Sequence, residues 1–270
     1  MGVLDGTDIL RDYQGEEWQS VRRMFNPGFS HQNLSTFLPT ILDKAAILVS
    51  LLEELVSTKE SFPLLNLTTN FALDVVGKVA IGADLHAQHL ENTKQGELAR
   101  LQIELLETFK GVSPESSPWW LVTPTVIRRR RLGRRINKIL DNVIRASFKR
   151  KQHQNIAFSS DRSILATRLR NVHALTRSIL DETRDQMKII LVGGHDTTGI
   201  MLSYAFRELS RHPRVLIALR TELDSLFGCE TSNDPAAVAE KLRSPAREEI
   251  MGRMQYTNAV IKEALRLHPP

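Results

Sequence analysis

The stretch that decides the fold is ILVGGHDTTGIML, residues 190–202. Two apolar runs, Ile190–Val192 and Ile200–Leu202, flank seven residues that are poor formers of a buried helix. Inside a helix each Gly costs about 1 kcal/mol relative to Ala, and Asp and Thr cost a few tenths each. Asp and Thr side chains also compete for backbone hydrogen bonds. We therefore expect a core helix that is locally loosened over residues 193–199.

Three interpretations of this expected soft spot are open. In the first, a flat ligand lies against the glycines, and Asp196 and Thr197 supply a carboxyl group and a hydroxyl for proton transfer. In the second, the segment is a kinked core helix whose polar side chains are satisfied. In the third, His195 and Asp196 resemble the His-Asp pair of metal-dependent phosphohydrolases. That site needs further ligands on other helices, and it leaves the neighbouring glycines and threonines without a role.

The composition indicates a folded protein that resides in a reducing compartment. The chain has 270 residues, of which 41% are hydrophobic, enough for a sizeable core and one or two domains. The net charge of +5 has consequences only where it is concentrated. A single cysteine, Cys229, excludes an intrachain disulfide. No run of about 18 apolar residues predicts a membrane span, and the N-terminus has no signal-peptide pattern.

Apolar residues recur at three- and four-residue steps along most of the chain, which is the spacing of amphipathic helices. The pattern predicts helices over residues 18–25, 34–56, 66–81, 97–109, 125–151, 180–211, 214–227 and 256–267. Residues 111–124 contain three prolines and are predicted to form a loop, and residues 230–245 a loop or short helix. No alternation typical of a strand occurs, so the predicted fold class is mainly α.

Two further motifs accompany the opening stretch. Trp18 and Arg22 lie four residues apart, hence on one helix face, and both side chains are hydrogen-bond donors only. In one interpretation both side chains bind the same anion. In the other, Trp18 packs against its neighbours and Arg22 forms a surface ion pair. Glu263 and Arg266 form a Glu-x-x-Arg motif followed by a double proline. The same spacing recurs without the double proline at Glu97/Arg100, Glu208/Arg211 and Glu240/Arg243. At these positions it predicts ordinary helical ion pairs.

Together these motifs resemble the cytochrome P450 family. GGHDTT at 193–198 is similar to the family's distal-helix signature, [Ala/Gly]-Gly-x-[Asp/Glu]-Thr-[Thr/Ser], at every specified position. Trp18-x-x-x-Arg22 resembles its third helix, and Glu263-x-x-Arg266 resembles the helix before its haem loop. The resemblance implies a mainly α, partial cytochrome P450 fold. It would form one partial domain over residues 1–270, truncated at both ends, without the haem-ligand loop and most of the β lobe.

The resemblance also implies a function and site residues. The family's activity is that of a haem-thiolate monooxygenase, which hydroxylates a small, apolar organic substrate with O2 and electrons from an NADPH-dependent reductase. By resemblance, Gly193 and Gly194 would lie close to the haem, and Asp196 and Thr197 would be the catalytic pair that relays protons to dioxygen. We expect haem as the cofactor.

The remaining motif residues receive their roles from the same resemblance. Trp18 and Arg22 would bind a haem propionate, and Glu263 and Arg266 would be a structural ion pair. The family's Cys-containing ligand loop follows the Glu-x-x-Arg helix, and Cys229 lies upstream of it, so no metal ligand is assigned in this chain. We therefore expect these residues alone to be inactive. The alternative is a catalytically dead helical fragment with a membrane- or partner-binding role.

The segment Arg128–Lys151 carries eleven basic residues and one acidic residue, Asp141, beside an apolar stripe. Three interpretations are open. In the first, the stripe packs on the core with the charges solvated; in the second, the helix contacts an anionic membrane surface with Trp119 and Trp120 at the headgroups. Nucleic-acid binding is the third, and we expect none because no recognised motif is present. By resemblance the location is the endoplasmic reticulum membrane; without an anchor, the cytoplasm is the alternative.

Overall fold

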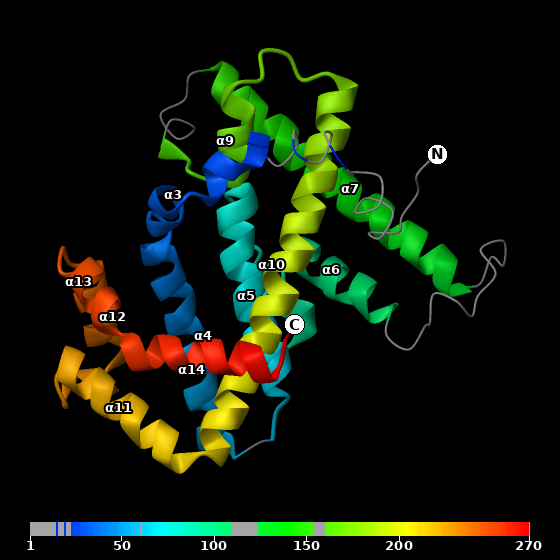
Figure 1. Cartoon of the computed structure of the whole chain (residues 1–270). Coiled ribbons are helices and arrows are strands. Elements are labelled where there is room, and N and C mark those ends of the chain that lie inside the picture. Colours follow the sequence, from blue (N-terminus) through cyan, green and yellow to red (C-terminus); the bar gives the residue numbers. More distant parts are fainter. Residues whose placement is uncertain are drawn as a thin grey trace. The chain divides into compact units, whose positions relative to one another are not determined.

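The computed structural model describes residues 15, 19, 23–59, 61–109, 124–153 and 160–269, and its regular elements there are helices (Figure 1). The α-helices are α3 (His31–Ser35), α4 (Leu38–Thr58), α5 (Leu64–Ile81), α6 (Glu97–Glu107), α7 (Pro124–Gln152), α9 (Ile164–Arg170), α10 (Arg177–Arg211), α11 (Pro213–Phe227), α12 (Pro235–Arg243), α13 (Arg247–Arg253) and α14 (Gln255–Leu267). Short 3-10 helices are η1 (Asn26–Phe29), η2 (Asn92–Lys94) and η3 (Thr231–Asn233). The predicted mainly α fold class is confirmed.

Local capping groups set several helix boundaries. α11 begins at Pro213 and ends at Phe227. It is capped by the next residue, Gly228, where a φ of +89° favours glycine and the N–H donates to the Asp224 carbonyl at 2.8 Å. α9 begins after Ser163, whose Oγ accepts a hydrogen bond from the Ala166 N–H at 3.1 Å. α9 and α13 were not among the predicted helices, because seven residues are too few to display a helical repeat.

The chain divides into two compact units, and the first comprises residues 1–36 and 76–193. In this unit α7 packs against α6 and α9, and η1 packs against α9. The apolar side of α7 is buried, with these core residues: Leu132, Ile136, Leu140, Ile144 and Phe148. The first interpretation of the basic segment, an apolar stripe packed on the core, is therefore confirmed for the stripe itself.

A network of charges around Arg184 joins α10 to α7 within the first unit. The Arg184 guanidinium bonds Asp141 of α7 at 3.2 Å, and Asp181 and Asp185 of α10 at 2.6 and 3.3 Å. Burial would lower the pKa of the Arg184 guanidinium, but the charges and hydrogen bonds of the three aspartates outweigh burial and raise it. The Arg184 side chain itself is largely enclosed, at 12% exposed, whereas the Asp181 side chain is 36% exposed.

The second unit comprises residues 37–75 and 194–270. α4 and α5 share an apolar cluster, while α12 packs on α4, and α11 on α14. The buried members of the cluster are Leu48, Leu55 and Leu67, and the partly buried ones are Leu52, Phe62 and Phe71. The Arg243 guanidinium bonds the Asp43 carboxylate and so ties α12 to α4. The expectation of a single domain over residues 1–270 stays a prediction.

The N-terminus of α14 is capped by a side chain from another helix. Met254, at the N-cap position, has no capping side chain. Glu222 of α11 accepts hydrogen bonds from the N–H groups of Tyr256 and Thr257 at 2.6 and 2.8 Å, and from Thr257 Oγ1 at 2.7 Å. Burial would raise the pKa of Glu222, but these hydrogen bonds outweigh it and lower that pKa.

One helix among the described residues, α5, is long and apolar enough to cross a membrane by length and composition alone. The expectation that nothing could span a membrane therefore does not extend to this helix. More than half of that span is buried inside the structure, as in the core helix of a soluble protein. Leu73, Ala80 and Ile81 are completely enclosed or nearly so.

Candidate functional site

The stretch 190–202 lies in the middle of α10, which runs for 35 residues, or about 50 Å, without a break. The expected opening of the helix over residues 193–199 is therefore wrong. The seven weak helix formers occupy one fifth of the 35-residue helix, and tertiary packing of the helix overrides their low propensity.

The residues of this stretch divide between two faces of α10. Leu191, His195 and Gly199 follow one another at four-residue steps, and all three are buried. Gly193, Asp196 and Thr197 share the opposite side, and all three are exposed. The Asp196 carboxylate turns to the open side of the helix, away from the core. Gly194, between the two faces, is half-buried.

Gly199 is required by close packing of two helices. A Cβ atom at this position would lie 2.7 Å from the Thr69 Cα and 2.9 Å from the Thr69 N, on α5. The buried hydroxyl of Thr68 donates a hydrogen bond to the Gly199 carbonyl at 2.9 Å. Sequence reasoning did not separate Gly199 from the other glycines. The available signal was its four-residue spacing from Leu191 and His195 on the buried face.

Gly193 has the opposite environment. A Cβ atom built there would meet nothing within 4 Å, so the backbone of α10 borders open space at this position. Asp196 and Thr197 are the next residues on the same face, one turn further along the helix. The structure thus brings together an unobstructed backbone, a carboxyl group and a hydroxyl on one exposed surface of α10.

Several predicted residues lie outside the described residues, namely Trp18 and Arg22, and also Trp119 and Trp120. Cys229 is exposed in the loop after α11, and its carbonyl accepts hydrogen bonds from Ser232 and Asn233. Within the part of the chain that the structure describes, no group of three His, Cys, Asp or Glu side chains could hold a metal ion.

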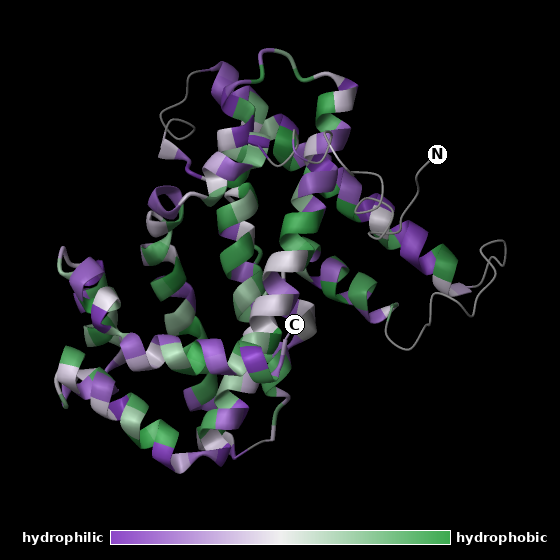
Figure 2. Ribbon diagram, in the orientation of Figure 1, coloured by the Kyte–Doolittle hydropathy of each residue, from purple (hydrophilic) through white to green (hydrophobic). Residues whose placement is uncertain are grey.

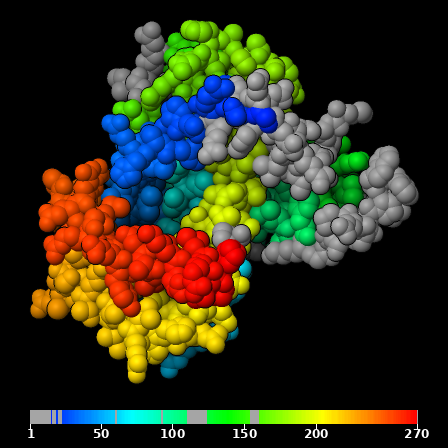
Figure 3. Space-filling view, viewed as in Figure 1, coloured from blue at the N-terminus to red at the C-terminus, as the bar shows by residue number. Residues whose placement is uncertain are grey.

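Glu263 and Arg266 are joined by a bidentate pair on α14, with Nε–Oε2 and Nη2–Oε1 distances of 2.7 Å. The hydrogen bond from Arg266 lowers the pKa of Glu263 below its ordinary range, outweighing desolvation. The pair is exposed, and Figure 3 shows α14 (red) on the molecular surface; of its residues only Ala264 is buried.

The other copies of the Glu-x-x-Arg spacing bond elsewhere, so the expected ion pairs along those helices were wrong. Glu97 bonds Arg135 of α7 at 2.6 Å, and Arg243 bonds Asp43. Glu208 bonds His268 at 3.1 Å and the adjacent Arg207 at 3.0 Å. Tertiary neighbours compete successfully with the partner three residues away, since a helical pair contributes only about 0.2–0.5 kcal/mol.

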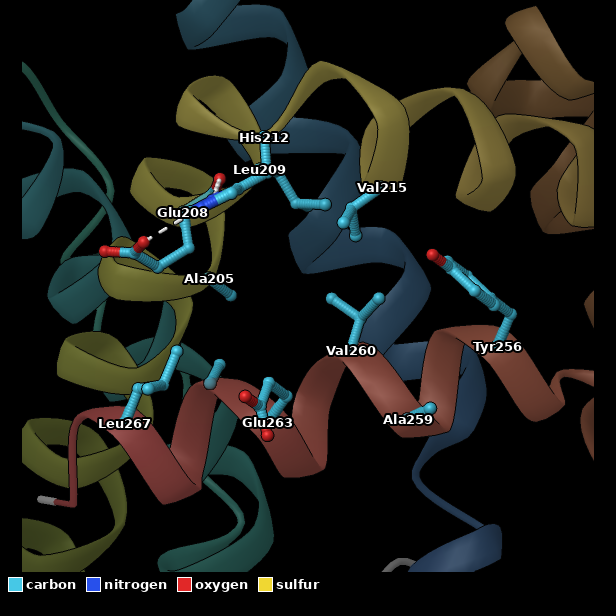
Figure 4. A pocket seen from close by; sticks show the side chains of 11 residues that line it. Ala205, Glu208, Leu209, His212, Val215, Tyr256, Ala259, Val260, Glu263 and Leu267 are labelled. Atoms are coloured by element: carbon cyan, nitrogen blue, oxygen red, sulfur yellow. Dashed lines mark hydrogen bonds and ion pairs between the residues drawn. The ribbon is translucent and has the colours of Figure 1, made fainter.

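A groove of about 320 Å³ lies between the end of α10, the start of α11 and α14 (Figure 4). Its walls are mainly aliphatic, with Glu208, His212 and Glu263 among the polar lining residues. At one end the His268 ring stacks on Tyr204, with ring centroids 4.1 Å apart, and its Nε2 bonds Glu208. The sequence motif at residues 263–270 gave no sign of this contact with α10.

Comparison with known proteins identifies similar chains. The cytochrome P450 family model matches residues 4–270. A cytochrome P450 monooxygenase, acrF, of Aspergillus aculeatus is 28% identical, covering 98% of this chain and 51% of the relative. An 11-oxo-beta-amyrin 30-oxidase of Glycyrrhiza uralensis is 25% identical, covering 97% of this chain and 48% of the relative.

A solved structure supports the fold. The crystal structure of the cytochrome P450 CYP102L1 superposes with a TM-score of 0.69 and 17% sequence identity, over 95% of this chain and 54% of that one. The chain spans about half the length of the curated relatives it matches. Because the family model covers nearly every residue, and the helices follow a solved member of the family, this chain belongs to the cytochrome P450 family.

Proposed function

We propose that this chain is part of a haem-thiolate monooxygenase and carries the helix that lies against the oxygen-binding side of the haem. The observation that carries the proposal is the open face of α10 beside Gly193, continued by Asp196 and Thr197. Relatives named monooxygenase and oxidase support oxygen insertion into an organic substrate. By family resemblance we propose a small, apolar substrate, electrons from an NADPH-dependent reductase, and a location at the endoplasmic reticulum membrane.

The residues of α10 fit a flat cofactor. A side chain at position 193 would project into the space that such a group needs, and none is present. The buried face of α10, with Leu191, His195 and Gly199, is occupied by packing, so only the opposite face can accept a ligand. We propose that Gly193 and Gly194 border the haem plane, and that Trp18 and Arg22 bind one propionate.

When bound, the haem would supply the activation of dioxygen. The protein's own contribution at this point is proton transfer. The Asp196 carboxylate is exposed, so it can take up a proton from solvent. The Thr197 hydroxyl, which both donates and accepts hydrogen bonds, can pass that proton to the open face beside Gly193. Glu263 and Arg266 are proposed to act structurally, by holding α14.

The decisive experiment measures haem uptake by two matched variants. Gly193 and Gly252 are both helical glycines at which an added Cβ meets nothing within 4 Å, but Gly252 lies on α13. We expect Gly193→Leu to reduce haem affinity at least about tenfold, the equivalent of roughly 1.4 kcal/mol, because the side chain occupies the space of the ring. Gly252→Leu should leave haem affinity unchanged. Titration with haemin, followed by the Soret absorption, measures both.

Equal haem affinity in the two variants would contradict the proposed position of the cofactor. Absence of haem uptake by the unaltered chain would favour the alternative of a catalytically dead fragment with a membrane- or partner-binding role. If haem binds, the carbon monoxide difference spectrum of the reduced protein reports the axial ligand. A band typical of thiolate ligation would support monooxygenase activity of these residues themselves.

A further inference from the structure

Ser244 lies in the short turn that joins α12 to α13 in the second unit. It is the C-cap residue of α12, with the extended backbone angles φ −72° and ψ 164°. Pro245 follows it, and Arg247 lies three residues after it, so the turn reads Ser-Pro-Ala-Arg. A residue before proline is restricted to extended backbone, which accounts for these angles. Pro245 is exposed and Ser244 is half-buried.

The pattern Ser-Pro-x-Arg is typical of sequences that a proline-directed protein kinase phosphorylates. Such a kinase accepts proline after the acceptor residue because proline has no N–H to leave unpaired, and it reads a basic side chain at the third position by charge. The sequence contains four Ser-Pro or Thr-Pro dipeptides. At Ser113, Ser117 and Thr123 the third residue onward carries no positive charge, so Ser244 alone completes the pattern.

The helices on either side of Ser244 are weakly anchored. The structure describes α12 and α13 in full, and no residue of either helix is buried. α13 has no side-chain cap at its N-terminus. Figure 2 shows hydrophilic residues (purple) on α13. Helices with so few buried contacts open at low free-energy cost, so a kinase that binds an extended segment can reach Ser244 without unfolding the core.

The Ser244 hydroxyl closes the last turn of α12. It donates a hydrogen bond to the Lys241 carbonyl at 2.7 Å and accepts one from the Ala246 N–H at 3.3 Å. The ester oxygen of a phosphoserine has no proton to donate, and the phosphate carries a charge of about −1.5 to −2 at neutral pH. That charge would lie beside the carboxyl end of α12, where the helix dipole is negative. Both changes weaken the last turn of α12.

The same turn carries the contacts that fasten α12 to its neighbours. The Arg243 guanidinium bonds the Asp43 carboxylate of α4, and the Lys241 ammonium bonds the Phe227 carbonyl at the end of α11. A phosphate on Ser244 is directly next to Arg243 in the chain. It competes with the Asp43 carboxylate for the guanidinium, because a phosphate accepts the same paired hydrogen bonds with a larger charge.

We infer that Ser244 is the acceptor site of a proline-directed protein kinase, and that its phosphorylation releases α12 from α4. In the transfer, the bond from the γ-phosphorus of ATP to its bridging oxygen breaks and a bond from that phosphorus to Ser244 Oγ forms. The hydroxyl proton passes to the base of the kinase, and ADP leaves. The inference does not rest on the proposed function, because it uses no residue of the open face of α10.

The first experiment measures phosphate incorporation into the 270-residue chain by a purified cyclin-dependent kinase with ATP, and mass spectrometry locates the site. Ser244 should be the main site, and Ser244→Ala should abolish most of the incorporation. Arg247→Gln should slow it about tenfold, as expected for loss of a charge-assisted hydrogen bond to the kinase. Arg253→Gln, which removes the same charge from the other end of α13, should leave the rate unchanged.

A second control removes the other dipeptides. The variant with Ser113→Ala, Ser117→Ala and Thr123→Ala should be phosphorylated as fast as the unaltered chain. Absence of incorporation, incorporation spread evenly over the four dipeptides, or equal rates for the two arginine variants would overturn the assignment of Ser244.

Hydrogen exchange measured by mass spectrometry tests the consequence for α12. Phosphorylation should raise amide exchange in α12 roughly fivefold, the factor that corresponds to one lost hydrogen bond, and leave exchange in α6 unchanged. Asp43→Asn should raise exchange in the unphosphorylated α12 and reduce the further effect of phosphorylation, because Arg243 has already lost its carboxylate partner. Unchanged or slower exchange in α12 after phosphorylation would overturn the proposed release from α4.

Discussion

The two glycines of α10 with opposite environments allow a sharp test of how this helix packs. The perturbation is Gly→Ala at position 193 or 199, the same added methyl group on the same helix. In a helix interior Ala is favoured over Gly by about 1 kcal/mol. At Gly193 the methyl group enters open space, so this gain is the whole effect. We expect Gly193→Ala to raise the free energy of unfolding by about 0.5–1 kcal/mol.

At Gly199 the same gain is opposed by two losses. The new Cβ would lie 2.7 Å from the Thr69 Cα, so α5 and α10 must separate by roughly 0.8 Å to restore an ordinary contact of about 3.5 Å. Because the obstacle is backbone, no rotamer change relieves it, and overpacking typically costs about 1–3 kcal/mol. The separation also lengthens the buried hydrogen bond from Thr68, worth about 1 kcal/mol. We expect a net destabilisation of about 1–3 kcal/mol.

Urea unfolding followed by far-ultraviolet circular dichroism measures both variants. The two free energies of unfolding should differ by about 1.5–4 kcal/mol, with equal m-values, because neither change alters the surface exposed on unfolding. The assay is made without haem, so that occupation of the face beside Gly193 does not enter. If Gly199→Ala were as stable as Gly193→Ala, the close approach of α5 to α10 would be refuted.

Three further predictions concern ion pairs and caps. Glu222→Gln should lower stability by about 1–2 kcal/mol through the weakened cap of α14. Because folding lowers the pKa of Glu222, its stabilising effect on the fold is complete above pH 4.5, its ordinary pKa, and declines as the pH falls below that value. Between neutral and acid pH, the urea midpoint of Glu222→Gln should therefore fall less than that of the unaltered chain. Arg184→Met should lower the free energy of unfolding by about 1–3 kcal/mol. It should also raise the pKa of Asp181, because the hydrogen bond from Arg184 helps to keep that pKa low against the effect of burial. Carbon-detected NMR titration measures this pKa. His268→Ala should raise the pKa of Glu208, which the His268 hydrogen bond lowers, in the same titration; an unchanged value would contradict that contact.

Much of the helical framework was predictable because helix periodicity is a local property of the sequence. The ranges predicted for residues 66–81, 125–151 and 256–267 agree with α5, α7 and α14 to within two residues at each end. The errors have a common cause. Short helices such as α9 carry too few residues for a repeat, and the weak helix formers of residues 193–199 are held helical by packing that no local window contains.

The site residues illustrate the same division. Motif and spacing marked Gly193, Asp196 and Thr197 as a group, and the structure brings these three to one exposed face. Spacing did not reveal that Gly199 serves the packing of α5, nor that Glu222 caps a helix about 30 residues later in the chain. Roles of this second kind depend on residues that approach one another only after folding.

The sequence by itself determined the fold class, the family and the residues in which a cofactor-binding face should be sought, because these follow from periodicity and short motifs along the chain. The tertiary structure alone decided which glycine of α10 borders open space and which supports packing. It also decided that Arg128 and Arg135 of α7 are bonded to carboxylates of α6. The physical reason is that burial and ion pairing depend on distances between helices, and the one-dimensional pattern does not contain those distances.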